Sequence, residues 1–144
     1  MPLELDQIRR RVQARLAEVK RAAAARRDRV AAAERAYEGF LANVAIPTLT
    51  AVAQSLSAEG YPCKVSTPGS AVRLVSDRSS RTYIEIRLDA TGPMPQVIAE
   101  VGRERGHRVL VDDRPVGEGL PIDAITDGHV LAVVVEAIGD LIDR

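Results

Sequence analysis

The sequence contains few of the residues that mark common catalytic and structural sites. Tryptophan is absent, aromatic residues make up 3% of the chain, and there are only one cysteine and two histidines. With so few aromatic rings, a folded core must consist mainly of valine, isoleucine, leucine and alanine. A single cysteine cannot form an internal disulfide, which fits a reducing compartment.

The chain also lacks the long apolar segments of membrane and secreted proteins. It has no run of about 18 apolar residues, so a membrane span is not predicted. Its first residues are acidic and then basic rather than apolar, so a signal peptide is not predicted either. We therefore expect a cytoplasmic protein. A length of 144 residues favours one domain with an appendage.

Residues that could form a catalytic, cofactor or metal site are few and scattered. Cys63 is expected to be a buried structural thiol, His107 a surface residue of a turn, and His129 a residue near the cap of the last helix. Their spacing matches no zinc site. The neighbouring Asp112 and Asp113 could bind a cation or act as acid and base, although a solvated turn is their commoner setting. No catalytic residue, cofactor or metal is predicted.

What the chain does have is one long helix-forming stretch, from Leu3 to Val44. It contains no proline and a single glycine, and it is rich in alanine, arginine, leucine and glutamate. A helix from Leu3 to Glu38 would span roughly 54 Å, whereas a body of about 100 residues is roughly 35 Å across. We expect the N-terminal turns to extend beyond the body.

Apolar side chains recur along this stretch at every third or fourth residue, as on one face of an amphipathic helix. The stripe is strongest near the N-terminus, at Leu5, Ile8, Val12, Leu16 and Val19. Its mean spacing, nearer about 3.6 than about 3.5 residues, does not specify a long left-handed coiled coil. We expect these residues to contact another chain, most simply a second copy. Packing on their own domain after a bend, or a free arm, are the alternatives.

Charge is distributed unevenly along the chain. The net charge is zero, yet residues 1–43 carry ten basic and six acidic side chains, and the remainder is acidic. A basic helix could lie along nucleic-acid phosphates or an anionic membrane surface, but a pI of about 6.7 is low for a nucleic-acid-binding domain. The candidate contacts are Arg9, Arg10, Arg11, Arg15, Arg26 and Arg27.

Helical signals change near Pro47, which removes a backbone hydrogen bond and crowds the preceding turn. The helix is therefore expected to be kinked or broken there, either within one helix or as a turn between two. A second helix is predicted over Thr48–Ala58, with Gly60 as its C-terminal cap. A last helix, Asp127–Ile142, is capped by Thr126. It is apolar over most of its circumference and is expected to be buried on more than one side, against the sheet and, as a further option, against a second chain.

Between these helices the apolar pattern alternates, which indicates β-strands joined by short turns. Strands are expected at Cys63–Ser66, Ala71–Ser76, Arg81–Asp89, Gln96–Arg103 and His107–Val111, followed by a loop over Asp112–Pro121. The fourth is the least certain because Gly102 interrupts it. Ile84, Ile86 and Leu88 should face the core. The opposite face should carry Arg73, Tyr83, Glu85 and Arg87, with Arg108 a candidate, and it could bind a peptide or an anion or be a plain solvated face.

The sequence thus predicts an α+β protein: a basic amphipathic helix over residues 1–46, and a compact domain over residues 47–144 with a four- to five-stranded antiparallel meander and a C-terminal helix packed on the sheet. The function we expect is non-enzymatic. The chain would be a self-associating interaction module of the adaptor or chaperone kind, a dimer in the simplest case. A nucleic-acid-associated protein is the first alternative, and a small enzyme with a site near Asp112, Asp113 and His107 is the second.

Overall fold

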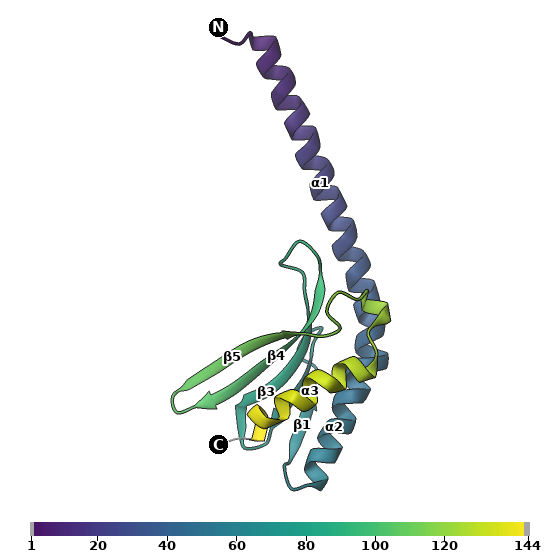
Figure 1. Cartoon of the computed structure of the whole chain (residues 1–144), viewed down its shortest axis with the longest axis vertical. Helices are drawn as coiled ribbons and strands as arrows, with labels where there is room; N and C mark the ends of the chain where they lie inside the picture. Colours follow the sequence, from purple (N-terminus) through teal and green to yellow (C-terminus); the bar gives the residue numbers. More distant parts are fainter. Residues whose placement is uncertain (1, 143–144) are drawn as a thin grey trace.

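The computed structural model describes residues 2–142 and has the predicted α+β architecture (Figure 1). The elements in chain order are α1 (Leu5–Phe40), a π-helical turn η1 (Leu41–Ala45), α2 (Ile46–Ala58), β1 (Cys63–Ser66), β2 (Val72–Ser76), β3 (Ser79–Asp89), β4 (Gln96–Arg105), β5 (Arg108–Pro115), a 3-10 turn η2 (Ile122–Ala124) and α3 (Asp127–Ile142). The five strands pair antiparallel in sequence order, which confirms the predicted meander.

One face of this sheet is covered by α2 and α3, and the core lies between them (Figure 1). The fully buried side chains are aliphatic, as the shortage of aromatic residues predicted: Leu49, Val72, Leu74, Ile84, Ile86, Val97, Val130 and Val134. The last turns of α1 also enter the core, where Tyr37 and Phe40 are buried and their ring centroids lie 5.9 Å apart. The core therefore begins before residue 47.

The irregularity expected near Pro47 takes the form of a π-helical turn, and the chain continues as one helix from Leu5 to Ala58. In this turn the backbone N–H of Ile46 donates to the carbonyl of Leu41, five residues back. The wider turn makes room for the Pro47 ring, which in a regular α-helix would crowd the carbonyl of Asn43. The C-terminal end is the predicted glycine cap: Gly60 has φ 90°, and the N–H of Tyr61 donates to the carbonyl of Leu56 at 2.8 Å.

The same helix contains an 18-residue segment of mean hydropathy 1.3, long and apolar enough by composition to cross a membrane. Of that segment, 28% is buried in the fold. This is weak evidence for a span, because a core helix of a soluble protein meets the same criteria. The absence of a membrane span stays a prediction.

Strand β5 is longer than the sequence indicated. It runs to Pro115, so Asp112 and Asp113 belong to a strand and not to the loop predicted for them. Each pairs with a residue of β4, namely Val101 and Glu100. Aspartate is a poor strand former, but pairing along a ten-residue neighbour and ion pairs across the sheet outweigh that local preference.

Candidate interaction surface

The N-terminal half of α1 projects beyond the body as an arm, which we define as residues 5–25 (Figure 1). The helix meets the body at Arg26. The guanidinium group of Arg26 donates to the carbonyls of Ala90 at 3.0 Å and Gly92 at 3.2 Å, in the loop between β3 and β4. At about 1.5 Å per residue, the arm is about 30 Å long.

The predicted apolar stripe lies on this arm and is exposed along its whole length. The exposed fractions are 67% for Leu5, 44% for Ile8, 51% for Val12, 51% for Leu16 and 48% for Val19. The arm does not bend back onto its own domain, so that alternative is not what the structure shows. The helix aligns the stripe residues on one side. Within the chain they form an apolar surface that faces solvent.

This stripe occupies the same side of the helix as the residues that pack on the body. Val12 and Val30 are eighteen residues apart, as are Val19 and Tyr37, and eighteen residues make about five full helical turns. Tyr37 is buried, and its hydroxyl donates to the carbonyl of Ile86 in β3 at 3.2 Å. The exposed stripe is therefore the continuation of the packing face of α1, beyond the point where the body ends.

The basic residues proposed as nucleic-acid contacts do not form a single patch. Arg9, Arg10 and Arg11 are consecutive, so they point in directions about 100° apart around the helix. Arg15 pairs with Glu18 at 3.2 Å, and Arg26 is engaged with the loop carbonyls. Arg27 is exposed beside it. Nucleic-acid binding through these side chains stays a prediction.

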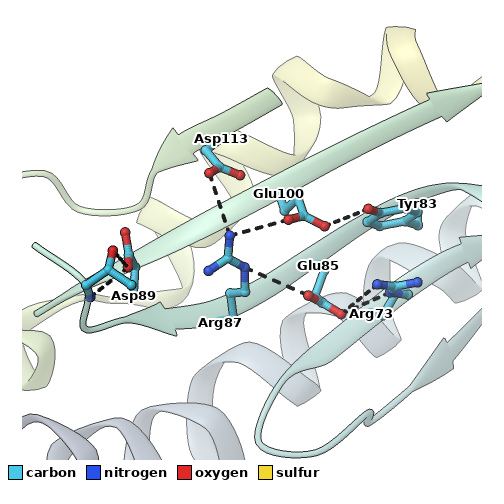
Figure 2. A network of polar contacts seen from close by, with 8 residues as sticks. Arg73, Tyr83, Glu85, Arg87, Asp89, Glu100 and Asp113 are labelled. Atoms are coloured by element: carbon cyan, nitrogen blue, oxygen red, sulfur yellow. Dashed lines mark hydrogen bonds and ion pairs between the residues drawn. The ribbon is translucent and has the colours of Figure 1, made fainter. Parts of the chain in front are cut away.

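The sheet face that α2 and α3 do not cover carries an ionic network of Arg73, Tyr83, Glu85, Arg87, Glu100 and Asp113 (Figure 2). The predicted sharing of this face by the first four residues is confirmed. Arg73 binds Glu85 at 3.0 Å, and Arg87 binds Glu100 at 3.3 Å and Asp113 at 3.6 Å. Because these charges are already paired with one another, the network resembles a self-satisfied surface more than an anion site.

Tyr83 has a structural role within the network. Its ring lies over Gly102, its direct partner on β4, and a Cβ atom at Gly102 would lie 2.4 Å from the ring. The guanidinium carbon of Arg73 lies 3.9 Å from the ring centroid, and the Tyr83 hydroxyl donates to Glu100 at 2.6 Å. The glycine that cast doubt on β4 is thus the residue that accommodates this ring.

Two tyrosine hydroxyls are held in their neutral form. Burial raises the pKa of Tyr37 to about 12, with a further contribution from the negative charge of Glu85. Burial also raises the pKa of Tyr83 to about 12, assisted by its hydrogen bond to Glu100. Both groups therefore keep their protons above the pH at which an exposed tyrosine ionises, and each acts as a hydrogen-bond donor.

The residues proposed for an enzyme site are not brought together. Asp112 and Asp113 are neighbours on a strand and point to opposite faces; Asp112 pairs with Arg114 at 2.8 Å and Asp113 with Arg87. His107 lies apart, in the tight turn between β4 and β5. Among residues 2–142, no cluster of three histidine, cysteine or acidic side chains is suited to a metal ion.

Arg108 and Cys63 differ from the positions expected for them, whereas His129 lies where it was expected. Arg108 is on the opposite face from the network, because the register puts its neighbour Val109 on the network side. Cys63 is half-buried and not fully buried; burial, aided by the charge of Asp77, raises its pKa, which fits an unreactive thiol. His129 Nδ1 accepts the backbone N–H of Thr126 at 3.0 Å, as expected of a residue near the helix cap.

A groove between α2 and α3 was not predicted from the sequence. Its volume is about 670 Å³, and its apolar lining includes Val52 and Leu56 of α2 with Leu131, Val135 and Ile138 of α3. Leu131 is 44% and Val135 56% exposed, so within the described chain α3 is buried on the sheet side only. Contact of its other side with a second chain stays a prediction. The spacing of Leu131, Val135 and Ile138 could have indicated an apolar side of α3 from the sequence alone. Only the tertiary structure shows that this side faces solvent within the described chain.

Comparison of the chain with known protein families, with curated proteins and with solved structures found no match. The fold class alone does not indicate a function, because the same architecture serves many. The function therefore has to be argued from the exposed surfaces and their chemistry.

Proposed function

We propose that the protein is a non-enzymatic interaction module that self-associates through the stripe on its arm, forming a dimer. The observation that carries the proposal is the exposure of Leu5, Ile8, Val12, Leu16 and Val19 in one line on a helix that extends beyond the body. Contiguous exposed apolar surface on a folded chain marks a site of interaction.

The arm lacks the packing that stabilises most helices in proteins. Most helical stability comes from packing of the apolar face, and the stripe has no partner within the described chain. Local propensity favours the helix, but it does not remove the large side chains of the stripe from water. A second helix covering the stripe supplies the missing packing.

The expected affinity follows from the exposed fractions. Full burial of a Val, Leu or Ile side chain contributes about 1.5–3 kcal/mol, so burying the exposed half of each stripe residue contributes about 1 kcal/mol. Ten such side chains in a dimer contribute roughly 10 kcal/mol, against an association cost of about 4–15 kcal/mol. At the low end of that cost about 6 kcal/mol remains, so the expected dimer is weak and concentration-dependent, with a Kd of roughly 40 μM.

The test is the solution mass of the full chain by light scattering over a range of concentrations. We expect the unmodified chain to dimerise, and the double variant Ile8→Glu/Leu16→Glu to be monomeric because two buried charges per chain would be unpaired. The matched control is Ala14→Glu/Ala25→Glu. It makes the same charge change on the same arm, but both alanines lie away from the stripe and are exposed.

The control variant should dimerise at least as tightly as the unmodified chain, because its added negative charges reduce the repulsion between the basic arms. A full chain that stays monomeric at about 1 mM, well above the expected Kd, contradicts the proposal. So does a stripe variant that dimerises as well as the control. Circular dichroism of each variant checks that the body is folded. We expect it to be folded, because the substituted side chains lie outside the core.

A further inference from the structure

We infer that the two arms pair antiparallel about a two-fold axis at Val12, so that Leu5 packs against Val19 of the partner subunit and Ile8 against the partner's Leu16. The inference rests on the proposed function, and it specifies the occupant of the stripe and the register. Two observations carry it: the symmetric spacing of the stripe, and the side of the helix on which the stripe lies.

The spacing of the stripe reads the same in both directions. From Val12, the next large apolar residues are four positions away on either side, at Ile8 and Leu16, and the ones after are a further three positions away, at Leu5 and Val19. A two-fold interface requires self-complementarity, in which residue i contacts residue j and j contacts i. An antiparallel pair centred on Val12 meets that requirement at every stripe position.

The side of α1 on which the stripe lies excludes a parallel pair on steric grounds. The stripe continues the packing face of α1, so a parallel partner lying on it would run toward the body. It would meet the loop between β3 and β4, which Arg26 holds against the helix through Ala90 and Gly92 (Figure 1). Both bodies would compete for the space between the two helices.

An antiparallel partner avoids this collision. In the Val12-centred register, Leu5 of the partner subunit, where its helix begins, is level with Val19, seven residues before Arg26. The partner's body then lies beyond the opposite end of the paired arms. The two Arg26 positions are about 42 Å apart along the helix axis. The dimer is therefore elongated, with a body at each end of the paired arms.

Disulfide trapping tests the register in a full-length Cys63→Ser background. Single cysteines are introduced at Ile8, Val12 or Leu16, and the protein is oxidised mildly at a concentration where light scattering shows the dimer. We expect Val12→Cys to cross-link with itself. Ile8→Cys and Leu16→Cys should cross-link with each other when mixed but not with themselves, because identical residues would be about 12 Å apart along the axis, beyond the reach of a disulfide.

A parallel pair gives a different pattern: each of the three variants cross-links with itself, and the mixture yields no preferred hetero-pair. That result overturns the inference but leaves the proposed self-association intact. Absence of the dimer in light scattering instead overturns the proposed function. Cross-linking in none of the variants, with the dimer present, overturns the Val12-centred register.

A second readout does not depend on disulfide geometry. Spin labels at Ala25→Cys, on the side of the helix away from the stripe, should be about 39 Å apart along the axis in the antiparallel dimer. In a parallel dimer they would be within about 20 Å. A pulsed electron paramagnetic resonance distance in the shorter range contradicts the inference.

Discussion

Gly102→Ala is expected to destabilise the fold, although alanine is the better residue in a β-strand. The added Cβ atom would lie 2.4 Å from Cε1 and 2.6 Å from Cζ of the Tyr83 ring, closer than non-bonded carbons approach. The backbone at Gly102 needs no positive φ, so the substitution introduces no conformational strain of its own. The effect therefore comes from displacing the Tyr83 ring.

The size of this effect follows from what holds the ring. Adding a methyl group to a well-packed site costs about 1–3 kcal/mol. Displacement of the ring also weakens its contact with the Arg73 guanidinium group, worth about 0.5–1 kcal/mol, and its hydrogen bond to Glu100. We expect a loss of about 2 kcal/mol in the free energy of unfolding, and a decrease in Tm of roughly 7 °C for a chain of this length.

Urea denaturation of four chains isolates the contact: the unmodified protein, Gly102→Ala, Tyr83→Ala and the double variant. With the ring removed, Gly102→Ala should be neutral or slightly stabilising, because only strand propensity is then at issue. The reasoning is refuted if Gly102→Ala alone leaves the free energy of unfolding unchanged, or if its cost is the same with and without the Tyr83 ring.

Three further outcomes are expected. Asp140→Asn should destabilise the protein by about 1–2 kcal/mol in urea unfolding, because the Asp140 carboxylate joins α3 to the sheet through Arg103 at 2.9 Å and Arg114 at 2.8 Å. The control is Glu136→Gln, at an exposed site on the same helix. A loss of stability no larger than that of the control would contradict this role of Asp140. Because the raised pKa of Tyr37 keeps its proton in the folded chain after the unfolded chain has released it, stability should fall as pH rises from about 10 to about 12. Tyr37→Phe should make that fall shallower in unfolding curves, and an unchanged slope would show that Tyr37 does not carry the linkage. Salt should tighten the dimer in sedimentation experiments, since each arm carries six basic and two acidic side chains and like charges repel. Binding of duplex DNA that weakens steeply with salt, and is lost on neutralising Arg9, Arg10 and Arg11, would instead favour the nucleic-acid alternative.

The sequence by itself determined the elements whose causes are local. Helix-forming residues without proline produce α1, and its stripe is a matter of spacing alone. Alternation within the second and third strands was enough to assign Ile84 and Ile86 to the core, and Arg73, Tyr83, Glu85 and Arg87 to the opposite face. The arm's overshoot followed from length, since a helix of that size exceeds the diameter of so small a body.

Only the tertiary structure decided the features that depend on contacts between distant residues. The Pro47 ring is accommodated by a π-helical turn within a packed helix and does not end it. Strand β5 continues through Asp112 and Asp113 because β4 and the side chains of Arg87 and Arg114 pair with them. Gly102 is compatible with β4 because Tyr83, nineteen residues earlier, supplies the ring that covers it. The stripe lies on the side of α1 that packs on the body, and this depends on where the sheet packs along the helix. Local helix propensity carries no information about the position of the sheet.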